Sequence, residues 1–266
     1  MQLSQIAAQL YTVRTHCQTA AGLAGSARKI RQIGYTAVQV SGVGPIPAAE
    51  ITAIMRDAGL VICATHELGA TILNEPHRVA ERLHTLGCRL TAYPYPHGID
   101  FARAEVVENF ARRLDAAGAV LRAEGITLAY HNHAFEFRRH GEGTVLDYLY
   151  RHTNPRHLAA ELDTYWVQTG GGNILQWIER LSGRLPFMHC KDYGIDDRDQ
   201  PVFREIGRGN LDFPAIIAAA RRAGCQWYIV EQDECPGDPF ESLRISYDYL
   251  VPLALPPAGG RPAAPA

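Results

Sequence analysis

Apolar runs of strand length alternate along this chain with segments of helical periodicity, and several of the helical segments end at a glycine. The strand-like runs cover residues 6–13, 35–42, 61–67, 89–96, 126–136, 158–166, 185–193 and 227–233. The helical segments cover residues 19–33, 47–58, 77–86, 102–123, 144–151, 173–181 and 213–223. Alternation of this kind indicates a parallel sheet with helical crossovers. Eight strand units predict a closed (β/α)8 TIM barrel of the α/β class.

The length supports this prediction, because the chain has 266 residues and a barrel needs about 250. An open doubly wound sheet is the alternative. It would carry a GxGxxG phosphate loop after its first strand, whereas this chain reads RTHCQTAAG there. We therefore expect a single barrel domain over residues 1–255. Residues 256–266 are rich in Pro, Gly and Ala, and we expect a disordered tail.

The composition limits the expected cellular location of the protein and the classes of partner that it could bind. The formal net charge is −2, so no electrostatic argument favours a nucleic-acid partner. No apolar run is long enough to span a membrane, and the N-terminus does not resemble a signal peptide. The 6 cysteines form no CxxC pair. We expect a cytoplasmic protein with no membrane partner.

The last four strand-like runs each end at potential metal ligands. The ends read YHNHAFE, ELDTYW, FMHCKDY and VEQD. Side chains alternate along a strand, so four pairs share a face: His131 with His133, Glu161 with Asp163, His189 with Lys191, and Glu231 with Asp233. The carboxyl ends of barrel strands meet at one mouth. Asp163, His189, Glu231 and one fifth-strand ligand could therefore hold a divalent cation such as Mn²⁺, Mg²⁺, Co²⁺ or Zn²⁺.

The motifs YHNHAFEF, LDTYWV, HCKD and IGRGNLDF resemble the xylose isomerase-like TIM barrels of the sugar phosphate isomerase/epimerase group. The resemblance is to the YHNH-type subgroup, whose relatives include inosose dehydratases and ketose epimerases. It implies a metal site of Glu, Asp, His and Glu on strands five to eight. Asp163, His189 and Glu231 match the last three positions. The fifth strand departs from the pattern, which leaves Glu136, His131 and His133 as alternatives for the fourth ligand.

The resemblance implies a divalent-metal-dependent isomerase or epimerase that acts on a sugar or keto-sugar. A metal that chelates a carbonyl and the adjacent hydroxyl acidifies the C–H between them, and a carboxylate then removes the proton to give an enediolate. We expect Glu231 to be one acid/base group and Glu136 the other. Lys191 would stabilise the enediolate, or else form a salt bridge with Asp192 or Glu161.

Substrate contacts are expected from other residues at the barrel mouth. His66 and His133 could bind sugar hydroxyls, Tyr11 and Trp166 could form an apolar wall, and Arg208 could reach an anionic or polyol group. For most of these residues a packing or surface role is an equally good interpretation.

Three other functions remain as alternatives to an isomerase or epimerase. Loss of a β-hydroxyl from the enediolate would make the enzyme a lyase or dehydratase acting on a keto-sugar or inosose. A phosphodiesterase of the endonuclease IV kind would use further histidines, but the second strand ends in QVSG without one. A non-catalytic sugar-binding barrel would not need so complete a ligand set. The partner is expected to be a small sugar or polyol derivative, and the chain is a candidate homodimer.

Overall fold

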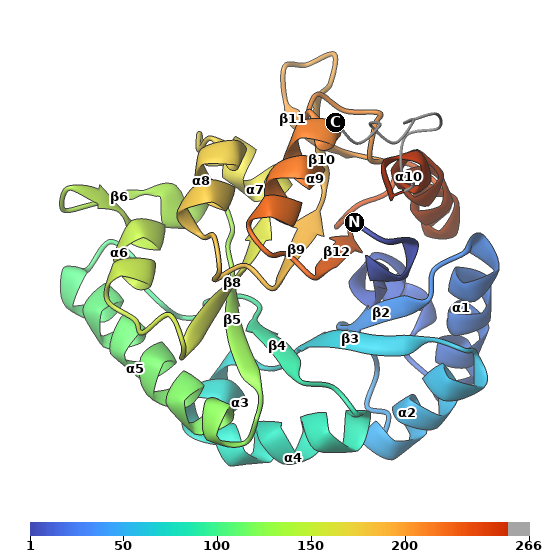
Figure 1. Ribbon diagram of the computed structural model, residues 1–266, viewed down its shortest axis with the longest axis horizontal. Coiled ribbons are helices and arrows are strands. Elements are labelled where there is room, and N and C mark those ends of the chain that lie inside the picture. The colour runs from blue at the N-terminus through green and yellow to red at the C-terminus, as the bar shows by residue number, and fades with distance from the viewer. Residues whose placement is uncertain (255–266) are drawn as a thin grey trace, which may run out of the picture.

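The predicted barrel is present in the computed structural model, which describes residues 1–254 (Figure 1). Its strands are all parallel, follow one another around the barrel in chain order, and close when the last pairs with the first. They are β1 (Ile6–Gln9), β2 (Ala37–Val40), β3 (Val61–His66), β4 (Leu90–Tyr93), β5 (Thr127–His131), β8 (Leu158–Asp163), β9 (Phe187–Cys190) and β12 (Trp227–Val230). The predicted fold class is confirmed. The predicted tail, residues 256–266, lies outside the described residues.

Helices follow the strands and surround the barrel (Figure 1). They are α1 (Ala20–Ile33), α2 (Ala48–Asp57), α3 (Gly69–Asn74), α4 (Pro76–Leu86), α5 (Ala104–Ala123), α6 (Val145–Arg151), α7 (Thr164–Thr169), α8 (Ile174–Arg180), α9 (Phe213–Arg222) and α10 (Pro239–Ala254). Short 3-10 turns η1 (Leu3–Gln5), η2 (Leu10–His16) and η3 (Phe135–Phe137) and the hairpins β6 (Arg139–His140)–β7 (Gly143–Thr144) and β10 (Asp192–Ile195)–β11 (Pro201–Arg204) complete it.

Several strands end earlier than the apolar runs predict. The first run was expected to extend to residue 13, but β1 ends at Gln9, whose side chain accepts a hydrogen bond from Tyr11 N and begins η2. The sixth run was expected to extend to residue 166, but Asp163 ends β8 and accepts a hydrogen bond from Trp166 N at 2.9 Å. In both places a side chain caps a helical turn directly after the strand, so the carboxyl end of the strand is sharply defined.

The inside of the barrel changes from apolar to polar along the strands. The apolar layer is mostly alanine, with three larger residues, and consists of Ala7, Ala37, Cys63, Ala64, Ala92, Ala129, Ala159, Phe187 and Ile229. Because side chains alternate, the residues two positions further along face the same interior. These are Gln9, Gln39, His66, His131, Glu161, His189 and Glu231. The barrel interior thus has an apolar layer and, next to it toward the carboxyl ends of the strands, a layer of polar side chains.

The strand register determines where each of these polar residues lies along the barrel axis. Asp163 pairs with His189, and His131 pairs with Glu161. Between β2 and β3 the register shifts at Val38 and Gln39, which marks a bulge in the barrel wall. Neighbouring polar groups are therefore brought to the same level by backbone pairing.

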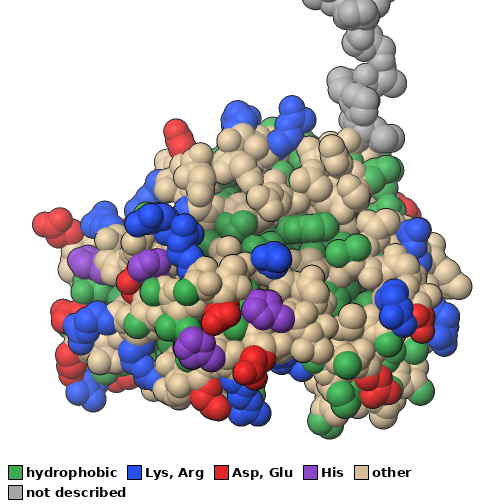
Figure 2. Space-filling model, turned by 60° about the horizontal axis from the view of Figure 1, so that its bottom comes forward, with side chains coloured by type: hydrophobic (Ala, Val, Ile, Leu, Met, Phe, Trp, Pro, Cys, Tyr) green, Lys and Arg blue, Asp and Glu red, His purple; other side chains and the backbone are tan. Residues whose placement is uncertain are grey.

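The outer surface mixes charges of both signs. On the face shown in Figure 2, Lys and Arg side chains lie among Asp and Glu side chains, in keeping with a formal net charge of −2. Within residues 1–254, no helix combines the length and the apolar character needed to cross a bilayer.

A substitution of Gly118 in α5 tests how closely this helix packs against the barrel. A Cβ at this position would overlap the carbonyl oxygen of His157, which precedes β8. We expect Gly118→Ala to lower the free energy of unfolding by about 1–3 kcal/mol, because backbone atoms must move apart. Gly25 in α1 is the matched control, since the nearest atom to its Cβ would be 4.0 Å away. There the higher helix propensity of alanine should stabilise the protein by about 0.5–1 kcal/mol. Urea denaturation of both variants measures the difference, and equal effects would contradict it.

Candidate metal centre

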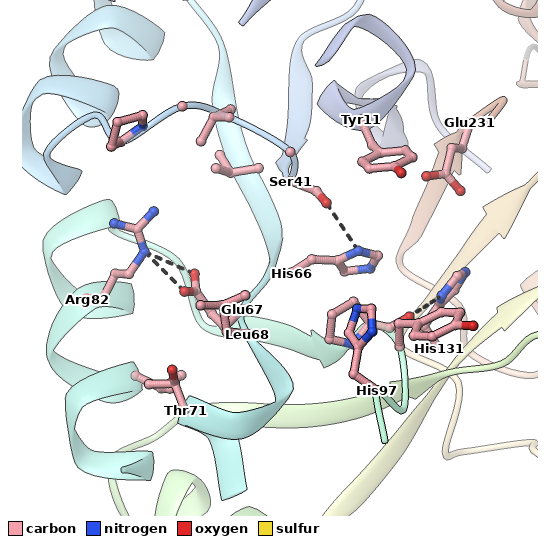
Figure 3. Close-up of a pocket in the computed structure, with 18 of the residues that line it drawn as sticks. Tyr11, Ser41, His66, Glu67, Leu68, Thr71, Arg82, His97, His131 and Glu231 are labelled. Atoms are coloured by element: carbon pink, nitrogen blue, oxygen red, sulfur yellow. Dashed lines mark hydrogen bonds and ion pairs between the residues drawn. The ribbon is translucent and has the colours of Figure 1, made fainter. Parts of the chain in front are cut away.

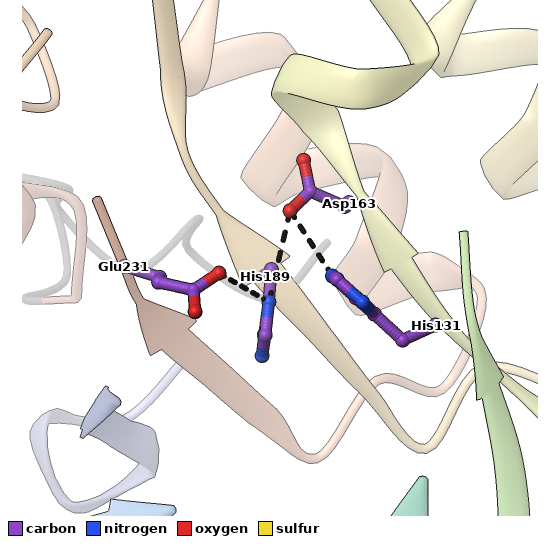
Figure 4. A group of neighbouring side chains, drawn as sticks. All are labelled: His131, Asp163, His189 and Glu231. Carbon is purple, nitrogen blue, oxygen red and sulfur yellow. Dashed lines mark hydrogen bonds and ion pairs between the residues drawn. The ribbon is translucent and has the colours of Figure 1, made fainter. Parts of the chain in front are cut away.

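Four side chains from consecutive barrel strands converge at the carboxyl end of the barrel (Figure 4). His131 ends β5, Asp163 ends β8, His189 lies in β9, and Glu231 directly follows β12. All four are buried, with exposed fractions of 0 to 4%. One nitrogen or carboxylate oxygen of each lies within 4.8 Å of the others. The structure therefore brings together the three predicted ligands and one of the three fifth-strand candidates.

The distances within this group suit a divalent cation. His131 Nε2 is 3.3 Å from Asp163 Oδ2, and His189 Nδ1 is 3.6 Å from the same oxygen and 2.8 Å from Glu231 Oε2. Atoms that bind one ion at roughly 2.0–2.2 Å lie about 3 Å from one another. His189 Nδ1 and Glu231 Oε2 are buried and have no hydrogen-bond partner of suitable geometry within residues 1–254. Their only close polar contacts among these residues are ion pairs, with each other, for the nitrogen with Asp163, and for the carboxylate oxygen with Lys191, and a bound cation would be a further partner for both atoms.

Hydrogen bonds to the backbone orient the first two ligands. His131 Nδ1 lies 3.1 Å from the carbonyl oxygen of Pro94, which can only accept, so Nδ1 carries the hydrogen and Nε2 is free to bind a cation. Asp163 uses Oδ1 to cap α7 and directs Oδ2 toward the group. Its own N–H donates to the Asn132 side chain at 3.0 Å. These contacts fix the ligand atoms before any ion binds.

Lys191 is a buried cation beside the group. Its ammonium lies 3.0 Å from Asp163 Oδ2, 2.6 Å from Glu231 Oε2 and 2.7 Å from Asp233 Oδ2, and the residue has no exposed area. Burial alone would lower the pKa of Lys191, but these carboxylates raise it well above its ordinary value. The partners differ from Asp192 and Glu161, which the sequence had suggested for a salt bridge. Lys191 is thus a fixed positive charge at the edge of the centre.

Glu136, which was expected as a ligand or an acid/base group, lies outside the four-residue group. The chain leaves β5 after His131 and turns through η3, which buries Glu136 behind the strand. Its carboxylate accepts hydrogen bonds from the Tyr130 hydroxyl at 2.7 Å and from His133 N at 2.8 Å. Burial raises the pKa of Glu136 to about 7. Both oxygens are engaged in supporting the turn, and Glu136 does not join the group.

A cavity of about 980 Å³ opens beside the centre (Figure 3). His131, Glu231 and Asp233 form its inner end. The rest of its wall comes from β2, β3, the segments that follow β1 to β5, and α4, and includes Tyr11, Ser41, His66, Glu67, Leu68, Thr71, Arg82, Tyr95 and His97. The volume suits a small organic ligand. Access to the centre is thus provided by the first half of the chain, whereas most of the ligands come from the second half.

Three of the predicted substrate residues line this cavity: Tyr11, His66 and His133. His133 packs face to face with Phe135, with ring centroids 5.2 Å apart. Burial, together with the nearby His131 and Lys191, lowers the pKa of His133 to about 2, so the ring is neutral. Trp166 lies behind it, with a ring-centroid separation of 5.4 Å from His133, and supports the wall from outside the cavity.

Arg208 lies away from the cavity, contrary to expectation. It lines a smaller depression beside α10, together with Arg244 and Tyr249. The loop is held there by Asp192, whose buried carboxylate accepts hydrogen bonds from Gly207 N at 2.9 Å and Gly209 N at 3.0 Å. The GRGNLD motif therefore serves the folding of this loop, and its arginine points to a different part of the surface.

Glu161 and Gln39 are polar residues of the barrel interior that were not among the predicted site residues. Glu161 is fully buried, and its two oxygens contact His66, His189 and Gln39. Burial alone would raise the pKa of Glu161, but His189 and His66 hold it below its ordinary value. The inward pairing of Glu161 with Asp163 along β8 was the available signal. The function of Glu161 depends on residues of three other strands, which the local sequence does not reveal.

Comparison with known proteins places the chain in a family. Residues 27–250 match the family described as xylose isomerase-like TIM barrel, and the chain belongs to it. A crystal structure of a sugar phosphate isomerase/epimerase from Parabacteroides distasonis superimposes with a TM-score of 0.78 at 21% identity, covering 95% of each chain. A xylose isomerase-like protein from Mycobacterium smegmatis in complex with magnesium has a TM-score of 0.74 at 13% identity, covering 96% of this chain and 98% of the other.

Curated relatives are similar over a shorter length. An inosose dehydratase from Geobacillus thermodenitrificans is 24% identical over 158 residues, which is 52% of this chain and 51% of the relative. The chain thus spans about half the length of this relative. The names of these proteins, a sugar phosphate isomerase/epimerase and an inosose dehydratase, are names of enzymes.

The fifth-strand ligand can be tested with two variants. We expect His131→Ala to weaken Mn²⁺ binding at least about tenfold, because it removes a nitrogen from the group. Glu136→Gln, at a residue that is equally buried but outside the group, should leave the dissociation constant nearly unchanged. Isothermal titration calorimetry measures both constants. The opposite order of effects would show that Glu136 is the ligand.

Ion binding should also depend on pH. Burial alone would lower the pKa of His189, but Glu161 and Glu231 raise it well above its ordinary value, so His189 Nδ1 is protonated near neutral pH without an ion. A cation must displace this proton, and its affinity should therefore rise with pH. Calorimetry at pH 7 in two non-coordinating buffers of different ionisation enthalpy should show release of about one proton per ion. Identical heats in both buffers would contradict the protonation of His189.

Proposed function

We propose that this xylose isomerase-like TIM barrel is a divalent-metal-dependent enzyme that isomerises or epimerises a keto-sugar through an enediolate. The main support is the position of Glu231, which belongs to the ligand group, lines the cavity, and contacts the ammonium of Lys191. A carboxylate, a fixed positive charge and a cation site thus meet where a substrate can enter. His131, Asp163, His189 and Glu231 would hold the cation.

The chemistry follows from these groups. A bound divalent cation would polarise the carbonyl and adjacent hydroxyl of a keto-sugar and acidify the C–H between them. Glu231 accepts that proton, and the electron pair of the C–H bond moves toward the carbonyl oxygen. Burial would raise the pKa of Glu231, but Lys191 and His189 hold it well below its ordinary value, so the carboxylate is ionised. The Lys191 ammonium stabilises the negative charge that develops on oxygen.

The carbon and the face to which the proton returns determine the product. Delivery to the neighbouring carbon gives an isomer, and delivery to the opposite face of the same carbon gives an epimer. His66 and His133 line the cavity and could hold hydroxyl groups of the sugar while this happens. The exposed Leu68 and the half-exposed Tyr95 give the outer cavity an apolar border, which suits the C–H face of a sugar ring.

A second candidate is a lyase that expels a β-hydroxyl from a keto-sugar or an inosose. The similarity to an inosose dehydratase favours it. The position of Glu136 favours it as well, because that carboxylate is engaged by Tyr130 and His133 and does not face the cavity as a second base. Elimination can begin with one base, whereas epimerisation requires proton transfer on both faces of one carbon.

Hydrogen exchange in D₂O tests the proposal. We expect the Mn²⁺-loaded protein to incorporate deuterium next to the carbonyl of at least one member of a panel of ketoses and inososes, as followed by NMR. An isomer or epimer supports the first candidate, and a dehydrated product supports the second.

Two variants identify the groups that act in this reaction. Asp163→Asn should abolish exchange while the fold is kept, and Lys191→Ala should slow exchange while Mn²⁺ still binds. A wild-type protein that binds Mn²⁺ but exchanges no substrate would contradict the proposal. An Asp163→Asn variant with most of its turnover would contradict the assigned site.

A further inference from the structure

Glu161 contacts two histidines that have different surroundings. Its Oε2 lies 2.6 Å from His66 Nε2, and its Oε1 lies 3.0 Å from His189 Nε2. His66 lines the cavity, whereas His189 belongs to the ligand group. Glu161 lies two residues before Asp163 on β8 but is not in the four-residue group, so the proposed reaction leaves it without a role.

A chain of amides that starts at the backbone determines the direction of these hydrogen bonds. Tyr11 N donates to Gln9 Oε1, which turns Gln9 Nε2 toward Gln39. Gln39 Oε1 accepts from Gln9 Nε2 at 2.7 Å, and Gln39 Nε2 donates to Glu161 Oε1 at 2.6 Å. Each amide has one accepting and one donating end, so reversing either one would place donor against donor or acceptor against acceptor.

This order determines which nitrogen of His189 carries a hydrogen. His189 Nε2 faces two acceptors, Gln39 Oε1 at 2.7 Å and Glu161 Oε1 at 3.0 Å, and must therefore be the donor. His189 Nδ1 is then the nitrogen that can offer a lone pair, and it lies toward Asp163 and Glu231. Nε2 keeps its hydrogen whether or not Nδ1 binds a proton or an ion.

The same reasoning applies to His66. Its Nε2 faces only the Glu161 carboxylate and donates to it, which leaves Nδ1 as an acceptor. Nδ1 lies 3.3 Å from the hydroxyl of Ser41, and both residues line the cavity (Figure 3). His66 Nδ1 therefore accepts a hydrogen bond from Ser41, and a substrate O–H that enters the cavity can take the place of that hydroxyl.

A second cation held by His66, His131 and Glu161 is a competing explanation, because their ligand atoms also lie within 4.8 Å of one another. Two contacts argue against it. His131 Nδ1 is bound to Pro94 O, so His131 has one nitrogen to offer, and that nitrogen already faces Asp163. His66 and Glu161 are joined at 2.6 Å, which is a hydrogen-bond distance that leaves no gap for an ion between them.

We propose that Glu161 is a positioning residue that sets the tautomer of both histidines. It would hold His189 with Nδ1 toward the metal centre and His66 with Nδ1 toward a substrate hydroxyl. One buried carboxylate would thereby align the cation ligand with the substrate contact. This inference rests on the proposed metal-dependent function.

The test compares Glu161→Gln with one reference variant. A glutamine at 161 offers one oxygen and one NH₂ group, so it cannot accept from both imidazoles, and one of them must turn or change tautomer. We expect the Mn²⁺ dissociation constant to rise by about 10- to 100-fold, as for other residues that orient a metal-bound histidine. Glu205→Gln is the matched control, because Glu205 is also buried and hydrogen-bonded, to Ser242, but lies outside the centre. Its Mn²⁺ affinity should not change.

A second measurement is made on the wild-type protein. Two-bond ¹H–¹⁵N spectra of ¹⁵N-histidine-labelled wild-type protein, loaded with diamagnetic Zn²⁺, should show hydrogen on Nε2 of both His66 and His189. Assignment comes from His66→Gln and His189→Ala. A bare Nε2 on His189 would overturn the inference even if Glu161→Gln failed to fold. A folded Glu161→Gln protein with wild-type Mn²⁺ affinity would also overturn it.

Different results would contradict the proposed metal-dependent function and the proposed positioning role of Glu161. If wild-type protein binds no Mn²⁺, or if His189→Ala binds it equally well, then the metal-dependent function itself is wrong. If wild-type protein binds Mn²⁺ through His189 but is indifferent to Glu161, then only the positioning role is wrong.

Discussion

The buried ammonium of Lys191 is the interaction on which the barrel mouth depends. Asp163, Glu231 and Asp233 all contact it, and three neighbouring carboxylates without a counter-charge would repel one another in an environment poor in water. Removing one partner of a buried ion pair commonly costs about 3–5 kcal/mol. Lys191 also holds the pKa of Asp163 well below its ordinary value, against the effect of burial. The carboxylates of Asp163 and Glu231 thus remain ionised in the interior, as a cation-binding centre requires.

The sequence predicted the parts of the site that follow from strand periodicity. Asp163, His189 and Glu231 lie at strand ends, where alternation and the convergence of parallel strands determine both direction and neighbourhood. Glu136 and Arg208 come after the strands have ended, in a 3-10 turn and a loop, where no such periodicity applies. Their positions are set by hydrogen bonds to Tyr130 and by the loop that closes on Asp192, and such tertiary contacts cannot be seen in the local pattern.

The prediction of the fold was limited in the same way, because it too rested on local sequence patterns. The eight strands were predicted in order, because their apolar runs are distinct and several of the helices between them end at glycines. The ends of β1 and β8 were predicted too late, since the apolar run continues into a capped turn. Helix α10 was not predicted, because the alternation of strands and helices was followed only as far as the last strand. It packs against α1, and the Tyr35 hydroxyl donates to Leu243 O at 2.9 Å.

The amide chain from Gln9 to Glu161 links the centre to the place where the barrel closes. Gln9 ends the first strand, and Glu231 follows the last, and these two strands pair with each other, as in Ala8 with Val230. The residues that orient His189 therefore reach their places only when the two ends of the barrel sequence have met. An incompletely closed barrel would contain most of the ligands but lack the alignment. An ion bound at the centre would consequently favour the fully closed barrel over partly wound intermediates, because only the closed barrel aligns its ligands.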